Sequence, residues 1–105
     1  MALKTVEKLI EIGVCAQLLG IHYVDDAIKL YESNGAPFTN MKLVYFKIAK
    51  DRNVTSKDVM NGISQVIDAA YRYGKKSEVM KYFGLTRRSN GNHLAVLYQR
   101  LKEKE

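Results

Sequence analysis

The chain has 105 residues, of which 47% are hydrophobic and 27% charged, a balance that excludes a disordered chain and suits one folded domain. The net charge of +6 is uneven: residues 1–40 carry three basic and five acidic residues (net −2), whereas residues 41–105 carry 14 basic and six acidic residues (net +8). Such an asymmetry indicates a polyanionic partner, although a generically basic soluble protein would show it equally well.

The first part of the sequence predicts three helices from the spacing of its apolar residues. In the first helix Val6, Leu9 and Ile10 share a face, and Gly13 is a suitable C-terminal stop. The second helix carries an apolar stripe formed by Val24, Ala27, Ile28 and Tyr31. It ends at the loop 33–37, which contains asparagine, glycine and proline, and a third helix follows over about 41–51.

The remainder of the sequence predicts three more helices, the longest over about 55–73 and a short one over about 77–83, each followed by a glycine. A sixth helix begins after Ser89 and has apolar residues at i, i+3, i+4 and i+7, namely Leu94, Leu97, Tyr98 and Leu101. No strand is predicted, and 102–105 has the composition of a frayed tail. The expected fold class is therefore all-α, a compact bundle of about six helices that forms a single domain over 1–105.

Cysteine content and hydropathy indicate the compartment. The one cysteine, Cys15, excludes an internal disulfide, and its apolar neighbours predict a small buried thiol. The first residues are charged where a secretion signal needs an apolar run, and no apolar stretch is long enough to cross a membrane. We therefore expect a cytoplasmic protein with no membrane partner.

The short segment between the third and fourth predicted helices has the pattern of a helix-turn-helix. Such a unit needs a small residue in its first helix, here Ala49, so that the second helix can cross closely. Its turn needs a residue that tolerates a left-handed backbone, here Asn53, and its second helix needs apolar positions such as Val59 and Ile63. Arg52 occupies a place that is often apolar, and any tight helical hairpin would share parts of this pattern.

The helix predicted over about 55–73 is a candidate DNA-recognition helix. Thr55 is a suitable N-cap, and Asp58 three residues later completes a variant of the capping box. In a helix-turn-helix, residues near the start of the second helix reach base edges in the major groove, where Asn and Gln bond adenine through two hydrogen bonds. The residues predicted to read bases are Ser56, Lys57, Met60, Asn61, Ser64 and Gln65. A polar face of this kind is equally typical of a solvated helix.

Basic residues surround this helix and would hold phosphates without reading sequence. The predicted phosphate contacts are Lys47, Lys50, Arg52, Arg72, Lys75, Arg87, Arg88 and Ser89. Arg87 and Arg88 form the strongest cluster because they precede a helix, whose N-terminal amides also favour phosphate. Each of these residues taken alone is more typical of an ordinary surface charge.

Five short segments, in a fixed order and spacing, have the pattern of a known family. They are 9–14; 20–28, with a glycine, an aromatic residue and Ala-Ile; 45–50, Tyr-Phe-Lys-Ile-Ala-Lys; 53–55, Asn-Val-Thr; and 89–90, Ser-Asn. Together they resemble the C-terminal DNA-binding domain of the stage-zero sporulation transcription factor of endospore-forming bacteria. The resemblance covers nearly the whole chain.

This resemblance implies six helices, a helix-turn-helix in the third and fourth, and DNA binding in the bacterial cytoplasm. It also implies domains placed in tandem on DNA, so we expect a dimer there, and RNA polymerase or another regulator is a further candidate partner. The family reads DNA with arginines and a glutamate, whereas the matching positions here are Asp58, Met60, Asn61 and Ser64, so the family's target sequence is not implied. Its phosphorylated receiver domain is not expected, because 105 residues leave no room for it.

Two other classes of function remain alternatives. A protein-interaction module with the same fold would suit the weakly charged face at Met60, Asn61 and Ser64, because such a surface is easier to bury against a protein. An enzyme is disfavoured, since no Cys/His cluster, phosphate-binding loop or nucleophile motif is present, and no metal or cofactor is predicted. We expect His22 in a loop or at a helix boundary and His93 on the surface at the start of a helix.

Overall fold

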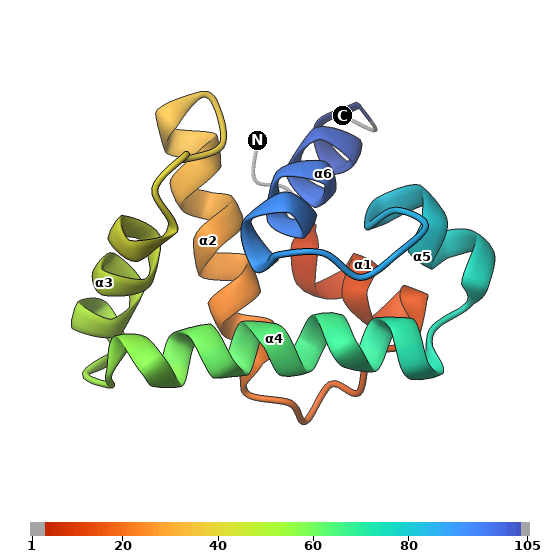
Figure 1. Cartoon of the computed structure of the whole chain (residues 1–105), viewed down its shortest axis with the longest axis horizontal. Helices are drawn as coiled ribbons and strands as arrows, with labels where there is room; N and C mark the ends of the chain where they lie inside the picture. Colours follow the sequence, from red (N-terminus) through yellow and green to blue (C-terminus); the bar gives the residue numbers. More distant parts are fainter. Residues whose placement is uncertain (1–3, 104–105) are drawn as a thin grey trace.

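The computed structural model describes residues 4–103, which form six helices and no strand (Figure 1). The helices are α1 (Thr5–Ile12), α2 (Gly20–Asn34), α3 (Met41–Arg52), α4 (Ser56–Tyr73), α5 (Lys76–Tyr82) and α6 (Asn90–Glu103). The predicted all-α class and the number of helices are confirmed. None of these helices has the length and hydropathy needed to span a bilayer. Of the predicted tail, residues 102 and 103 belong to α6, and 104–105 lie outside the described residues.

The long helix α4 lies along one side of the molecule, and the other helices are arranged over it (Figure 1). Both α2 and α6 stand on its inner side, α3 packs near its N-terminal end and α5 near its C-terminal end. Helix α1 packs beside α2, and the loop 13–19 between them runs along α4. One side of α4 therefore faces the core, and much of its opposite side faces solvent.

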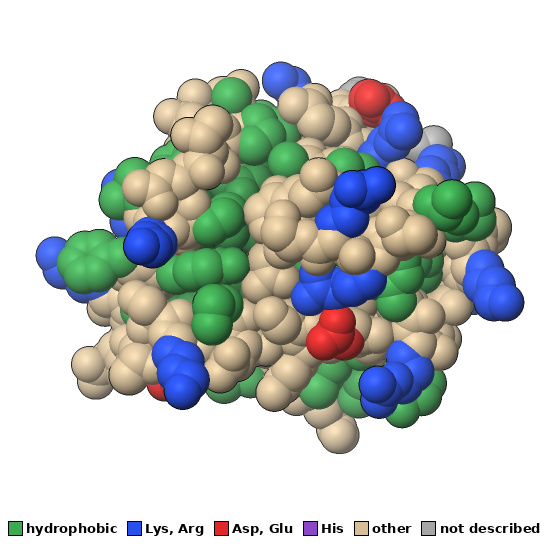
Figure 2. Space-filling view, viewed as in Figure 1, with side chains coloured by type: hydrophobic (Ala, Val, Ile, Leu, Met, Phe, Trp, Pro, Cys, Tyr) green, Lys and Arg blue, Asp and Glu red, His purple; other side chains and the backbone are tan. Residues whose placement is uncertain are grey.

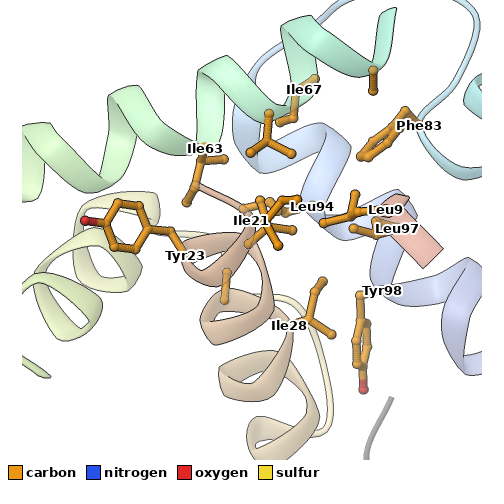
Figure 3. Close-up of a cluster of buried hydrophobic side chains, with 14 of the residues drawn as sticks. Leu9, Ile21, Tyr23, Ile28, Ile63, Ile67, Phe83, Leu94, Leu97 and Tyr98 are labelled. Carbon is orange, nitrogen blue, oxygen red and sulfur yellow. The ribbon is translucent and has the colours of Figure 1, made fainter. Parts of the chain in front are cut away.

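The hydrophobic core fills the space between α4 and the helices over it (Figure 3). Side chains with at most 1% exposure form its centre, including Leu9, Ile21, Ile28, Ile63, Ile67, Phe83, Leu94 and Leu97. The apolar stripes predicted for the second and sixth helices are buried as expected. Burial of an aliphatic side chain contributes about 1.5–3 kcal/mol, so this core holds the helices together.

Two glycines lie where α2 crosses α4. A Cβ atom on Gly20 would lie 2.0 Å from the carbonyl oxygen of Gly62 and 2.8 Å from a methyl group of Val66. A Cβ atom on Gly62 would lie 2.7 Å from the ring of Tyr23, which is itself buried. These distances are well inside van der Waals contact, so the two backbones approach this closely only because both residues lack a side chain.

Two sequence-based expectations about burial in the N-terminal part are wrong. Cys15 is exposed, because the residues around it form the loop along α4, and Val14 rather than the thiol enters the core. Ile10 is 46% exposed, because Leu9 and Ile12, three positions apart, supply the buried face of α1. Hydropathy marked both segments as apolar but could not show which side chains would face the neighbouring helices.

Candidate nucleic-acid interface

A tight turn joins α3 to α4. Asn53 has φ 57° and ψ 46°, and it is the one described residue other than glycine with a positive φ. The N–H of Val54 donates to the carbonyl oxygen of Ala49 at 3.0 Å and so closes the end of α3. Asparagine tolerates this left-handed conformation better than most residues do. The left-handed backbone predicted for Asn53 is thus confirmed.

Helix α4 starts with the predicted capping box. The hydroxyl of Thr55 accepts a hydrogen bond from the N–H of Asp58 at 3.0 Å, and the carboxylate of Asp58 accepts one from the N–H of Thr55 at 3.2 Å. These bonds satisfy backbone donors that the first turn of a helix leaves without partners. Val59 and Ile63 follow at 0% exposure, so the capped end of α4 also packs against the core.

The residues predicted to read bases do not all lie on an open surface. Most of them are exposed on the first three turns of α4, namely Ser56, Lys57, Met60, Asn61 and Gln65. Ser64 is half-buried, and its hydroxyl lies 2.9 Å from Nδ2 and 3.3 Å from Oδ1 of Asn90 at the start of α6. The exposed set presents amide, hydroxyl and ammonium groups, which can bond base edges, whereas Ser64 is engaged within the protein.

The residues predicted to hold phosphate differ in how they are engaged. Lys47 and Lys50 are exposed on the outer face of α3, and Arg72 and Lys75 are exposed near the C-terminal end of α4. None of these four forms an ion pair with another residue in the part of the chain that the structure describes. Arg52 instead donates two hydrogen bonds to the carboxylate of Asp26 on α2, at 2.7 and 3.0 Å. Its guanidinium therefore links α3 to α2.

The loop 84–89, which leads into α6, carries the two predicted arginine contacts. Figure 2 shows basic side chains grouped around an acidic one on this face of the molecule. Arg87 pairs with Asp68 of α4 at 2.7 Å and donates to the carbonyl oxygen of Arg88. Arg88 is exposed and forms no ion pair within residues 4–103. Ser89 accepts a hydrogen bond from the N–H of Asn92 at 3.3 Å, so its hydroxyl caps α6.

His93 holds this loop from the inside, so the expectation that it lies on the surface is wrong. Its side chain is 0% exposed, with Nδ1 2.9 Å from the carbonyl oxygen of Phe83 and Nε2 2.6 Å from the N–H of Arg88. An Nε2 that accepts a hydrogen bond requires the neutral ring with its proton on Nδ1. Burial lowers the pKa of His93, and the nearby charges of Arg87 and Arg88 lower it further, against the opposing effect of the Phe83 carbonyl.

Sequence reasoning missed both His93 and Asn90 as buried residues. Asn90 is 9% exposed and bonds to residues of α3, α4 and the preceding loop. A usable signal did exist, because positions 90 and 93 extend the helical spacing of the apolar stripe of α6 toward its N-terminus. Polarity alone assigned His93 to the surface and kept Asn90 out of the predicted apolar stripe.

A groove of about 540 Å³ lies between the loop 13–19 and α4. Its lining includes Leu18, Gln65, Ala69, Arg72 and Tyr73. Among residues 4–103, no three His, Cys, Asp or Glu side chains come together in a way that could hold a metal ion. The candidate site is the polar and basic face of α4, and Gln65 and Arg72 on this helix also line the groove.

A helix that presents amides and hydroxyls to solvent, with cations on both sides, is the arrangement by which small helical domains bind DNA. A family model described as the C-terminal domain of the sporulation initiation factor Spo0A matches residues 5–101. The chain belongs to this family, which confirms the resemblance seen in the sequence and places it among DNA-binding transcription regulators. No curated protein matches the chain.

Proposed function

We propose that this chain binds specific DNA sequences and regulates transcription through a helix-turn-helix formed by α3 and α4. The observation that carries the proposal is the exposed polar face on the first three turns of α4, directly after the left-handed turn and the capping box. A helix held in this way can enter the major groove, which is about 12 Å wide. Asn61 and Gln65 lie one turn apart on this face, and their amides would bond adenine.

Phosphate binding would come from cations along the length of α4. The helix has 18 residues and is therefore about 27 Å long, enough to pass several phosphates. Lys47, Lys50 and Arg88 would act with the base-reading segment, and Arg72 and Lys75 would act near the other end. With roughly four to six phosphates neutralised, the logarithm of the binding constant should fall with the logarithm of salt concentration at a slope of about −4 to −5.

The proposal extends to compartment and assembly. A regulator of this family acts on chromosomal DNA, so we propose the cytoplasm as its compartment and two copies in tandem as its arrangement on DNA. RNA polymerase or another regulator would then be its protein partner.

A second candidate function is a protein-interaction module that keeps this fold without specific DNA binding. The observation that favours it is a set of exposed apolar side chains on α3 and α4: Phe46 at 59%, Leu43 at 43% and Met60 at 39% exposure. Aromatic residues and methionine are enriched in protein interfaces. The two candidates differ in what they predict for binding to random and selected DNA.

The test is a selection of binding sites from random DNA, followed by mobility-shift titrations on the selected site and on random DNA at several salt concentrations. Asn61→Ala or Gln65→Ala should cost about 1–3 kcal/mol on the selected site and relax the sequence preference. Arg88→Ala should weaken binding to both DNAs and reduce the salt slope by about one unit. Asn92→Ala, an exposed change on α6, serves as the matched control. If the wild-type protein shows no binding at low salt, the second candidate is favoured.

A further inference from the structure

We infer that Asn90 is a positioning residue for base reading, because one buried amide fixes the start of α4 relative to both α3 and the loop that carries Arg88. The inference rests on the proposed function and adds to it a residue that would touch no DNA. It also gives Ser64 a role inside the protein in place of base contact.

The side chain of Asn90 lies where three segments meet. Its Nδ2 is 2.9 Å from the hydroxyl of Ser64 and 3.3 Å from the carbonyl oxygen of Met60, both on α4. The same nitrogen is 3.2 Å from the hydroxyl of Tyr45 on α3. On its other side, Oδ1 accepts a hydrogen bond from the guanidinium of Arg87 at 3.0 Å. A carbonyl can only accept and a guanidinium can only donate, so these partners determine which way the amide points.

These bonds supply a constraint that the hydrophobic core does not. Apolar contacts are non-directional, so the buried stripe of α4 leaves the helix some freedom to roll about its axis. Hydrogen bonds have preferred distances and angles, and the two on α4 act at residues 60 and 64, on either side of Asn61. A recognition site must be held within about 0.5 Å and 10–20° of its working geometry, a tolerance that small rolls exceed.

The same amide also locates the phosphate-binding loop. Arg87 bonds to both Asn90 and Asp68, and His93 accepts a hydrogen bond from the N–H of Arg88. The loop is thus attached to the first turn of α6 and to α4 together. The backbone that carries Arg88 and the exposed face of α4 consequently keep a fixed relation to each other.

The variant that tests this inference is Asn90→Asp, with Asn90→Ala beside it. The aspartate keeps an acceptor for Arg87 but loses both N–H donors to α3 and α4. We expect the ratio of affinities for selected and random DNA to fall roughly tenfold in both variants. In Asn90→Ala, which leaves the charge unchanged, affinity for random DNA and the slope of binding against salt should stay near their wild-type values, because Arg88 and Asp68, which also holds Arg87, remain. Asn90→Asp adds a negative charge beside Arg87, so it should in addition weaken binding to both DNAs by the same factor. Asn92→Ala is the matched control, since it removes an exposed amide from the same helix.

Hydrogen exchange provides a readout that does not depend on DNA. In Asn90→Asp the amides of residues 57–64 should exchange faster, while those in the middle of α2 should keep wild-type rates. Tyr45→Phe removes a single acceptor and is the milder variant to use if the Asn90 variants do not fold. If the wild type prefers its selected site and the folded variants keep the same ratio of affinities for selected and random DNA, the inference is overturned but the proposed function is not. A wild type that binds selected and random DNA equally would overturn the proposed function and this inference with it.

Discussion

Acidification is expected to destabilise this protein through His93. The buried ring is neutral because its Nε2 accepts a hydrogen bond, and its pKa is lowered from the ordinary value of 6.5, chiefly by burial. In the unfolded chain the ring titrates near its ordinary value, so below pH 6.5 the unfolded state binds more protons than the folded state. The contribution of His93 to stability is therefore fully present above that pH and is lost as the pH falls toward the folded pKa.

The size of the effect follows from proton linkage. A difference of one bound proton changes the free energy of unfolding by at most about 1.4 kcal/mol per pH unit. For a domain of this size, each 1 kcal/mol shifts the melting temperature by about 4–8 °C. The assay is thermal unfolding followed by circular dichroism between pH 5 and 8 at constant ionic strength. We expect the melting temperature to decline once the pH falls below about 6.5.

Two glutamine variants isolate the histidine responsible. His93→Gln should be less stable at pH 7.5, because it disturbs a buried site, but its melting temperature should vary less between pH 5 and 6.5. His22→Gln removes a histidine exposed on α2 and should keep the wild-type pH profile. Equal pH profiles for the wild type and His93→Gln would refute the assignment to His93.

Three further predictions concern the turn, the helix crossing and the arginine loop. Asn53→Gly should be tolerated, whereas Asn53→Val should clearly lower the melting temperature, because a β-branched residue resists the left-handed backbone. Equal melting temperatures for the two variants would contradict this prediction. Gly20→Ala should lower the free energy of unfolding in urea by about 1–3 kcal/mol or more, because the added methyl group meets the Gly62 carbonyl. If the variant is as stable as the wild type, α2 can move away from α4. Asp68→Asn should release Arg87 toward phosphate and steepen the salt slope of DNA binding by about 0.9, whereas an unchanged slope would mean that Arg87 stays held by Asn90.

Local signals explain which parts of the fold could be predicted from the sequence. The capping box of α4 and the left-handed Asn53 depend on residues within a few positions of each other, so their chemistry was visible in the sequence. The burial of His93 depends on a carbonyl ten residues earlier, and that of Asn90 on a hydroxyl 45 residues earlier. The sequence does not show partners so distant, and although positions 90 and 93 continue the helical spacing of the buried face of α6, polarity favoured the surface for His93.

The same difference applies to the candidate site. The helical spacing of apolar residues correctly predicted which face of α4 is exposed and which is buried, apart from Ser64, which lies half-buried at the edge of the exposed face. It could not show which charges are already paired, because Arg52 with Asp26 and Arg87 with Asp68 lie 26 and 19 residues apart. The cations available to a phosphate, Arg88 among them, become apparent only when these pairs are known.

The contact between Gly20 and Gly62 bears on how this domain could be given a new DNA target. Where two backbones meet without side chains between them, a change of sequence cannot be absorbed by repacking, and Tyr23 closes the space beside Gly62. A library that seeks new specificities can therefore randomise positions 57, 61 and 65, whose side chains are exposed, but should hold position 62 as glycine. Variants with another residue at position 62 should fail to give folded protein, so they should disappear before any selection for DNA binding.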